Sequence, residues 1–383
     1  MTGSAPFRPL LILSGVFFLG AIAAASAHLE TGIAVGAIAG TASLAVATAL
    51  HPTWRGFSFS LWVATFVTAA MFRPDWFRTW GTFEQKALIV PLIQIIMFGM
   101  GTTLSLLDFA RVLRMPRVVL IGMVLQFTVM PLTGAALAAA LGFQAEVAAG
   151  VVLIGSCPGG VASNVMAYLA RGNVALSVTM TACSTLVSPL ATPLAMKLLA
   201  GQYVEIDVIN MLLTIVRIIL APIVLGLIAN RLLRLMKLKE VWLERVLSFL
   251  AMAAICYVIA IITSLSRDQL LTVGLLLVAA AVVHNAVGYF LGYWGAALAG
   301  LDEPTRRTVA LEVGMQNGGM ASGLAIEVLK SSNAALAAAI FGPWMNISGS
   351  ILASWWRGRP VRDGIGYAHS SPSDPEGAPA DFD

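Results

Sequence analysis

Long apolar segments recur along almost the whole chain, and short polar segments separate them. Most apolar segments are about 17 to 25 residues long, which suits a helix that crosses about 30 Å of hydrocarbon. Only helices and closed barrels satisfy every backbone polar group in lipid, and the alternating ten-residue segments typical of barrel strands do not occur in this sequence. The pattern predicts twelve membrane-spanning helices, at residues 9–27, 31–50, 57–73, 86–106, 117–140, 146–169, 174–200, 208–230, 244–264, 270–297, 307–328 and 333–356.

The composition of the chain supports this interpretation. Hydrophobic residues make up 58% of the 383 residues and charged residues only 11%, whereas a soluble domain has about 25% charged residues. We therefore predict an all-α polytopic membrane protein whose surroundings are the lipid bilayer. The net charge of +4 comes from basic residues that lie mostly between the spans and form no continuous basic face, so no nucleic-acid partner is expected.

The lysines and arginines are distributed unevenly between the two sides of the predicted membrane. With the N-terminus placed in the cytoplasm, most of the 23 basic residues fall on the cytoplasmic side, as the positive-inside rule requires. Both termini are therefore expected in the cytoplasm, in a multi-pass protein of the cell's inner (plasma) membrane. The segment after Arg362 is polar, acidic and rich in proline, and residues 357–383 are expected to form a disordered cytoplasmic tail.

The first apolar segment also has features of a secretory signal peptide. Arg8 precedes it and small residues end it, as in a cleaved leader. A second apolar segment follows after only three residues, His28 to Glu30, which favours an uncleaved helical hairpin. A mature chain that began near His28 would contradict this interpretation.

Two segments of the chain resemble each other. GGVASNVMAYLARGNVAL at 159–176 and GGMASGLAIEVLKSSNAAL at 318–336 share GG, AS and, with one inserted residue, N, A and L. Chance similarity between two helices rich in alanine and glycine is the alternative. The two copies enter the predicted membrane from opposite sides, however, and interrupted helices in oppositely oriented halves indicate an inverted-repeat secondary transporter with its site at the interruptions.

The first interruption is GSCPGGVASN. Pro158 lacks a backbone donor and disfavours helical geometry before it, while Gly159 and Gly160 carry no Cβ to resist an irregular path. We expect the helix to open here and to restart near Ser163 and Asn164. A restarted helix offers free N–H groups to an anion and the ended half offers carbonyls to a cation. A plain proline kink is the alternative.

The second interruption, LEVGMQNGGMASG at 311–323, contains the only carboxylate well inside a predicted span, that of Glu312. An ionised carboxylate in hydrocarbon is costly unless a positive charge pairs with it. Arg217 in another span, a proton or a metal cation could supply that charge.

Polar side chains near the two interruptions favour a small cation bound by oxygen. The first predicted cation site consists of Ser163, Asn164, Ser177, Thr181 and Glu312. A second combines the Gln126, Gln316 and Glu312 side chains with carbonyls freed at Val313 and Met315. The alternative is that each hydroxyl bonds back to its own helix.

Several motifs in order resemble the bile acid:sodium symporter family, in its bacterial branch. They are LIQIIMFGMGTTL (92–104), GSCPGGVASNVMAYLARGNVALSV (155–178), VHNAVGY (283–289), EVGMQN (312–317) and NISGS (346–350). The resemblance covers about residues 57–356 and implies ten helices in two inverted repeats of five (5+5), arranged as a core and a panel domain. It also implies two sodium ions, bound by the two residue sets just given, and a small organic anion as substrate.

The resemblance divides the chain into six parts. These are an extra N-terminal helical hairpin (1–56), panel helices of repeat 1 (57–107), core helices of repeat 1 with a broken helix at 155–164 (108–201), panel helices of repeat 2 (202–266), core helices of repeat 2 with a broken helix at 312–322 (267–356), and the tail (357–383).

The substrate is expected to contact the crossing of the two broken helices. The residues implied are Val161, Ala162, Asn317, Met345 and Asn346. Relatives that bind bile acids have a threonine and a histidine where this chain has Val161 and Met345, so the anion stays open among bile-acid-like molecules, sulfated steroids, 2-oxo acids and pantothenate-like carboxylates. Proton coupling through Glu312 and a non-transporting membrane sensor are the alternative functions.

Other chemistries find little support in the sequence. It contains no Walker loop and no HExxH motif, and a hydrolase using Ser163 or Ser322 would lack an oriented base, because no carboxylate is evident beside the mid-span His284. We expect His284 and Asn285 to make interhelical hydrogen bonds. The three cysteines lie within apolar segments, so no disulfide framework is expected. The protein is therefore predicted to be no enzyme and to need no organic cofactor.

Overall fold

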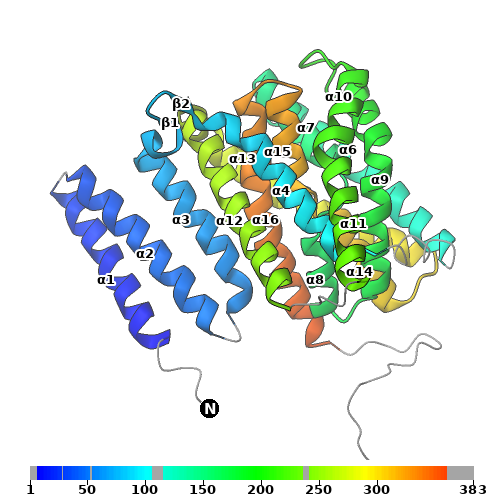
Figure 1. Ribbon diagram of the computed structural model, residues 1–383, viewed down its shortest axis with the longest axis horizontal. Coiled ribbons are helices and arrows are strands. Elements are labelled where there is room, and N and C mark those ends of the chain that lie inside the picture. Colours follow the sequence, from blue (N-terminus) through cyan, green and yellow to red (C-terminus); the bar gives the residue numbers. More distant parts are fainter. Residues whose placement is uncertain (1–6, 28, 52–53, 106–114, 236–240, 360–383) are drawn as a thin grey trace, which may run out of the picture.

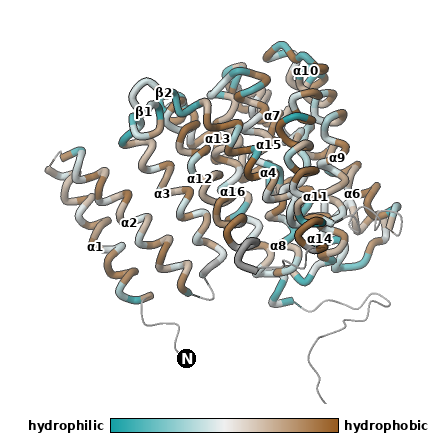
Figure 2. Tube along the Cα trace, in the orientation of Figure 1, coloured by the Kyte–Doolittle hydropathy of each residue, from teal (hydrophilic) through white to brown (hydrophobic). Residues whose placement is uncertain are grey.

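The computed structural model describes residues 7–27, 29–51, 54–105, 115–235 and 241–359. Within these ranges almost every segment is helical, and the sheet consists of two short strands, β1 (Thr79–Trp80) and β2 (Phe83–Glu84). Eight helices among the described residues are long and apolar enough to cross a membrane. Apolar residues run along the helices while hydrophilic ones gather at the ends (Figure 2). The predicted all-α polytopic membrane fold is confirmed. Arg357, the first residue of the predicted tail, is the last residue of a helix, while residues 360–383 and His28 lie outside the described residues.

Each of the twelve predicted spans coincides with a helix or with a pair of half-helices. The uninterrupted ones are α1 (Phe7–Ser26), α2 (Glu30–Leu50), α3 (Ser58–Phe72), α4 (Ile89–Thr103), α6 (Pro116–Ala140), α9 (Val174–Leu199), α12 (Val241–Leu265), α13 (Arg267–Leu298) and α16 (Ser332–Arg357). One span is α10 (Val208–Ile215), a π-helical turn η5 (Val216–Leu220) and α11 (Ala221–Leu235) in succession. Short 3-10 turns η1 (Arg55–Phe57), η2 (Pro74–Phe77) and η3 (Gln85–Leu88) flank α3 and α4.

The two interrupted spans divide where the sequence analysis placed the breaks. The first consists of α7 (Ala145–Ser156) and α8 (Ala162–Leu169), and the second of α14 (Glu303–Gly314) and α15 (Gly318–Glu327). Extended backbone at Cys157 and Met315 ends the first half-helix of each pair. A simple kink would keep the helix continuous, so both spans are true breaks.

The hairpin of α1 and α2 lies at one edge of the molecule beside α3 (Figure 1). Three glycines four residues apart on α2, Gly32, Gly36 and Gly40, face α1, and a Cβ on Gly36 would lie 2.7 Å from the carbonyl oxygen of Phe17. Small residues at this spacing let two membrane helices approach closely. The Ser14 hydroxyl also donates to the Gly40 carbonyl at 2.8 Å. The hairpin is therefore held by its own packing.

The centre of the molecule is packed closely around α7 and α16. Residues 334–339 of α16 are all buried, and a Cβ on Gly150 of α7 would lie 2.1 Å from the Ala334 carbonyl oxygen. These small side chains bring the two helix backbones into direct contact.

The two broken spans have matching ends. Among the described residues, Arg171 after α8 and Lys330 after α15 are the two non-glycine residues with positive φ, at 56° and 52°. Each stands twelve residues after the first glycine of its copy of the repeat. The side chains of Asn173 and Ser331 then cap α9 and α16. The matching local structure supports the repeat, while its extension to a full 5+5 arrangement stays a prediction.

Candidate functional site

The two broken spans cross through their extended segments. The Gly160 N–H donates to the Met315 carbonyl at 3.0 Å, and the Asn317 N–H donates to the Pro158 carbonyl at 2.8 Å. These bonds form an antiparallel bridge between Gly159 and Gln316. Backbone groups freed by one break are therefore satisfied partly by the other break, as non-helical backbone inside a membrane requires.

The glycine pair makes this crossing possible by close approach. A Cβ on Gly159 would lie 2.9 Å from Oε2 of Glu312, and one on Gly160 would lie 2.8 Å from the Gln316 carbonyl oxygen. Neither glycine has a positive φ. Their function differs in this respect from the sequence-based expectation, because they make room for the other break rather than supply an unusual backbone conformation.

The first predicted cation site is assembled around the carboxylate of Glu312, which is only 2% exposed. Its Oε1 accepts hydrogen bonds from Ser163 and Ser177, both at 2.5 Å, and its Oε2 accepts one from Thr181 at 2.9 Å. Oδ1 of Asn164 lies 2.8 Å from the Ser177 hydroxyl and 3.3 Å from that of Thr181. The structure thus brings all five residues of this set together, and we call them the Glu312 cluster.

The three hydroxyls of the Glu312 cluster make more close contacts with oxygen atoms than they have protons to donate. The Ser163 hydroxyl also lies 2.7 Å from the Gly160 carbonyl oxygen, so three hydroxyls make six close contacts with oxygen acceptors. A hydroxyl carries one proton, so the three hydroxyls donate in three of these contacts. A cation among these oxygens, or a proton on Glu312 together with an Asn164 amide whose nitrogen faces Ser177 and Thr181, would make the remaining contacts favourable.

The second predicted site is assembled in part. The Gln126 amide donates to Oε1 of Gln316 at 2.6 Å and to the Cys157 carbonyl at 3.0 Å, and the Gln316 amide donates to the Val313 carbonyl at 2.7 Å. Oε1 of Gln126 is buried without a hydrogen-bond partner. The carbonyl of Met315 accepts from Gly160, and the contacts of the Glu312 carboxylate lie in the first cluster.

Amides from α6 and α13 stabilise the two breaks in the same way. Gln126 of α6 donates to the carbonyl of Cys157, the residue that directly follows α7. Asn285 of α13 donates to the carbonyl of Gly314, the last residue of α14, at 2.5 Å. Each therefore binds a carbonyl that the interrupted helix leaves free. Nε2 of the neighbouring His284 lies 3.2 Å from the Met130 carbonyl oxygen of α6, which agrees with the interhelical bonding expected for this pair.

The five residues assigned to the substrate lie on or beside the crossing, but they have local partners. The backbone N–H of Gln316 lies 2.9 Å from the sulfur of the buried Met345. Oδ1 of Asn317 caps α15 by accepting from the Met320 N–H, and the Asn346 amide donates to the Gly342 carbonyl of its own helix. Val161 and Ala162 are half-buried at the start of α8. Their contact with a substrate stays a prediction.

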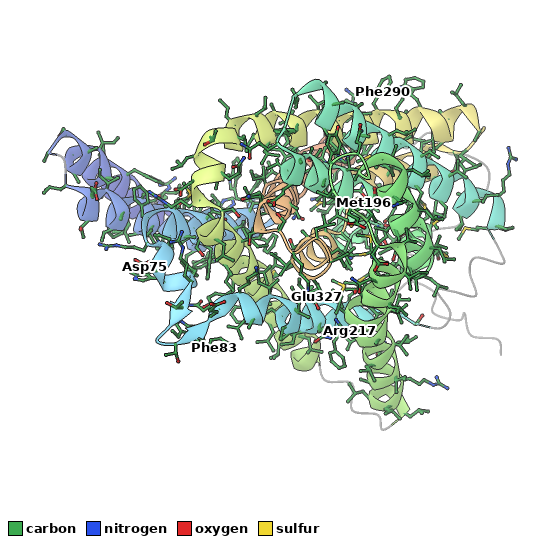
Figure 3. All side chains as sticks on the ribbon, turned by 90° about the horizontal axis from the view of Figure 1, so that it is seen from above. Asp75, Phe83, Met196, Arg217, Phe290 and Glu327 are labelled. Carbon is green, nitrogen blue, oxygen red and sulfur yellow. The ribbon has the colours of Figure 1, made fainter. Side chains whose placement is uncertain are left out.

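Arg217 does not pair with Glu312. Its guanidinium lies 3.0 Å from Glu327 of α15, and Lys330 approaches the same carboxylate at 3.7 Å. Arg217 and Glu327 are labelled side by side in Figure 3. The two residues join η5 to α15 on the side of the protein predicted to face outward.

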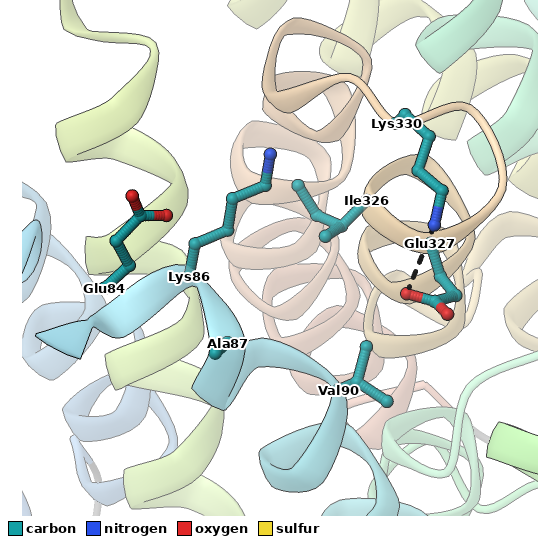
Figure 4. Close-up of a pocket in the computed structure, with 7 residues that line it drawn as sticks. All are labelled: Glu84, Lys86, Ala87, Val90, Ile326, Glu327 and Lys330. Atoms are coloured by element: carbon teal, nitrogen blue, oxygen red, sulfur yellow. Dashed lines mark ion pairs between the residues drawn. The ribbon is translucent and has the colours of Figure 1, made fainter.

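A polar cavity of about 460 Å³ adjoins this ion pair, between η3, α4 and α15. Lys86 extends into it opposite Glu327 and Lys330 (Figure 4). Because the cavity separates a predicted panel helix from a predicted core helix, it lies where the two domains would part.

Arg307 is a buried residue that the sequence analysis treated only as a cytoplasmic charge. It is 2% exposed and lies 2.9 Å from Glu303, while Nη1 donates to the Ala170 and Trp356 carbonyls at 3.0 and 3.1 Å. It therefore neutralises the carbonyl ends of α8 and α16. The spacing of four residues between Glu303 and Arg307 indicates an ion pair on one helix face, but nothing in the neighbouring sequence predicts that Arg307 is buried.

Comparison with known proteins identifies the family of the chain. A sequence profile described as "Sodium Bile acid symporter family" matches residues 90–286. The chain belongs to this family. The resemblance drawn from the sequence motifs is thereby confirmed, and so is the conclusion that the protein is a membrane transporter rather than an enzyme.

Relatives in the family come from bacteria, plants and animals. The "Uncharacterized sodium-dependent transporter YocS" of Bacillus subtilis is 40% identical over 303 residues, which cover 79% of this chain and 92% of YocS. The "Probable sodium/metabolite cotransporter BASS1, chloroplastic" of Oryza sativa subsp. japonica is 36% identical, over 80% of this chain and 73% of its own length. The "Ileal sodium/bile acid cotransporter" of Oryctolagus cuniculus is 32% identical, over 61% of this chain and 67% of its own length.

Proposed function

We propose that the protein is a sodium-coupled symporter of an organic anion that works by alternating access. Membership of a sodium symporter family supports the class of activity, and the relatives named above are described as sodium-dependent transporters or sodium cotransporters. The Glu312 cluster and the neighbouring Gln126 and Gln316 are the residues that we assign to two sodium ions.

The composition of the Glu312 cluster is the observation that carries this proposal. Its ligands are one carboxylate, one amide and three hydroxyls, which are hard oxygen donors that suit a hard cation. A sodium ion in this cluster is neutralised by the single carboxylate, and the anionic substrate balances the charge of the second sodium ion.

The substrate in this proposal docks at the crossing. The starts of α8 and α15 carry a partial positive charge, and Val161, Ala162, Asn317, Met345 and Asn346 lie there. Bound sodium fixes the crossing, and the predicted core then rocks against the predicted panel of α3, α4, α10 to α11 and α12. Two sodium ions with one monovalent anion move a net charge of +1, which corresponds to about 2.3 kcal/mol per 100 mV, so uptake is electrogenic.

Replacement of potassium by sodium tests the cation site without knowledge of the substrate. The purified protein is unfolded by heat in detergent, at fixed pH and constant ionic strength, while NaCl replaces KCl. We expect sodium to raise the melting temperature with saturation, because a ligand of the folded state stabilises it by about 2.7 kcal/mol at one hundred times its dissociation constant. The Glu312→Gln variant is expected to lose this response.

Glu327→Gln is the matched control, because it removes a carboxylate from the same broken span but outside the cluster. It should keep the sodium response. A Glu312→Gln protein that still responded to sodium like the native chain would disprove the cation assignment. A response to pH with none to sodium would instead favour proton coupling. Repeating the titration with small carboxylates and sulfonates would then identify anions whose stabilising effect requires sodium.

A further inference from the structure

A second cavity lies between the N-terminal hairpin and the rest of the protein, away from the crossing. It has a volume of about 600 Å³. Leu11 of α1, Leu44 of α2, Ala64 of α3 and Ile347 of α16 contribute to its walls. Its lining is therefore largely apolar, and it depends on the hairpin, which precedes the residues that match the family profile.

One residue in the wall of this cavity has a hydroxyl without a partner. Ser60 of α3 lines the cavity and is 6% exposed, and its Oγ is buried without a hydrogen bond. Nearby hydroxyls are satisfied, because Thr48 in the same wall donates to the Leu44 carbonyl and Ser58 donates to the Ala45 carbonyl. A buried unpaired hydroxyl is unfavourable, so a ligand with a hydrogen-bond acceptor would favour a rotation of the Ser60 side chain that turns Oγ into the cavity.

The position of the cavity along the membrane normal indicates the kind of ligand. Leu11 lies in the first turns of α1, Thr48 in the last turn of α2 and Ser60 in the first turn of α3, all at the same end of these helices (Figure 1). In the predicted topology these helix ends lie near the cytoplasmic surface of the membrane, where hydrocarbon gives way to headgroups. Trp54 lines the cavity and is 49% exposed, and tryptophan is enriched at membrane–water interfaces. Arg8 in the first turn of α1 is exposed on the same side.

We propose that this cavity binds an acyl chain of a membrane phospholipid from the leaflet next to the N-terminus. The Ser60 hydroxyl donates to an ester carbonyl of the lipid, and Arg8 lies at the level of its phosphate. A soluble anion is a poor fit, because the described side chains of the cavity wall are mostly apolar and none of them is positively charged. The lipid fills the space between the hairpin and α3 and joins them to α16.

Native mass spectrometry of the purified full-length protein tests this site. Protein in dodecyl maltoside is titrated with dioleoyl phosphatidylglycerol, and bound lipids are counted. We expect one phospholipid that resists detergent washing. Ala64→Trp, which fills the cavity, should abolish its binding. Ser60→Ala should weaken it about fivefold, the effect of one hydrogen bond.

Two matched variants serve as controls and are expected to bind the lipid like the native protein. Ile12→Trp adds the same side chain on α1 at a residue that is 68% exposed, and Ser43→Ala removes a hydroxyl that bonds its own helix. Unchanged affinity in Ser60→Ala would overturn the proposal even if Ala64→Trp failed to fold. The absence of a tightly bound lipid from the native protein would also overturn the proposal. A native dimer that dissociates in the Ala64→Trp variant would overturn it too, because the cavity would then hold part of a second copy of the chain.

Discussion

At the scale of single residues, the crossing depends on glycines that lack a Cβ as much as on the side chains that form hydrogen bonds there. Gly159 lets the carboxylate of Glu312 approach the first break, where a Cβ would be only 2.9 Å from Oε2. The position of the charged Glu312 side chain therefore depends on the absence of a side chain at Gly159.

Gly159→Ala tests this close approach. The added methyl group must displace the Glu312 carboxylate or the break itself, at a cost of about 1 to 3 kcal/mol, so we expect sodium to bind about 5-fold to 150-fold more weakly in the thermal titration. Gly342→Ala on α16 is the control, because nothing lies within 4 Å of its added Cβ. Equal sodium affinity in both variants would show that the cluster tolerates the methyl group.

The residues of the Glu312 cluster were predictable because their signal is strong in the sequence. A lone carboxylate in an apolar segment needs a positive partner, and the family motifs supplied the other ligands. The burial of Arg307 was not predictable, because its partners at Ala170 and Trp356 are backbone carbonyls far away in the chain. The hydrogen bond from the Gly160 N–H to the Met315 carbonyl is equally non-local.

At the scale of elements, hydropathy located every helix but did not determine how helices pair. The length of an apolar segment fixes whether it crosses a membrane, and proline and glycine mark where it breaks. The glycine spacing on α2 was visible in the sequence, but only the structure shows that this face packs against α1.

Gly36→Ala tests the packing of the hairpin. Its Cβ would lie within 2.8 Å of atoms of Ala21 as well as close to the Phe17 carbonyl. We expect α1 and α2 to separate locally and the melting temperature in detergent to fall, for a loss of about 1 to 3 kcal/mol. Sodium affinity should be unchanged, because the hairpin is remote from the Glu312 cluster. Gly20→Ala on α1 has free space around its Cβ, and an equal fall in that control would contradict the proposed packing.

At the scale of the whole molecule, the ion pair between Arg217 and Glu327 joins a predicted panel element to a predicted core helix. Arg217 is well exposed, so the pair contributes no more than about 1 kcal/mol. It is weak enough to break in each transport cycle if the two domains rock against each other.

A reversible cross-link between these positions tests the relative motion. Arg217→Cys and Glu327→Cys are combined in a chain whose Cys157, Cys183 and Cys256 are replaced by alanine, and a short bifunctional methanethiosulfonate joins the new thiols. We expect the cross-link to stop sodium-driven uptake of an anion found in the thermal screen, and dithiothreitol to restore it. Each single-cysteine variant should keep its activity under the reagent. Full uptake by the cross-linked protein would contradict a rocking motion at this boundary.

The bridge between Gly159 and Gln316 also bears on the ancestry of the chain. In the predicted division into two inverted repeats, Ser163, Asn164, Ser177 and Thr181 belong to repeat 1 and Glu312 belongs to repeat 2, and the structure brings these side chains together. A chain of half this length would carry either the hydroxyls or the carboxylate, and neither part binds a cation well alone. Such a chain could complete the cage only with a second copy inserted upside down. A shorter ancestor would therefore have needed to enter the membrane in both orientations before its gene was duplicated and fused.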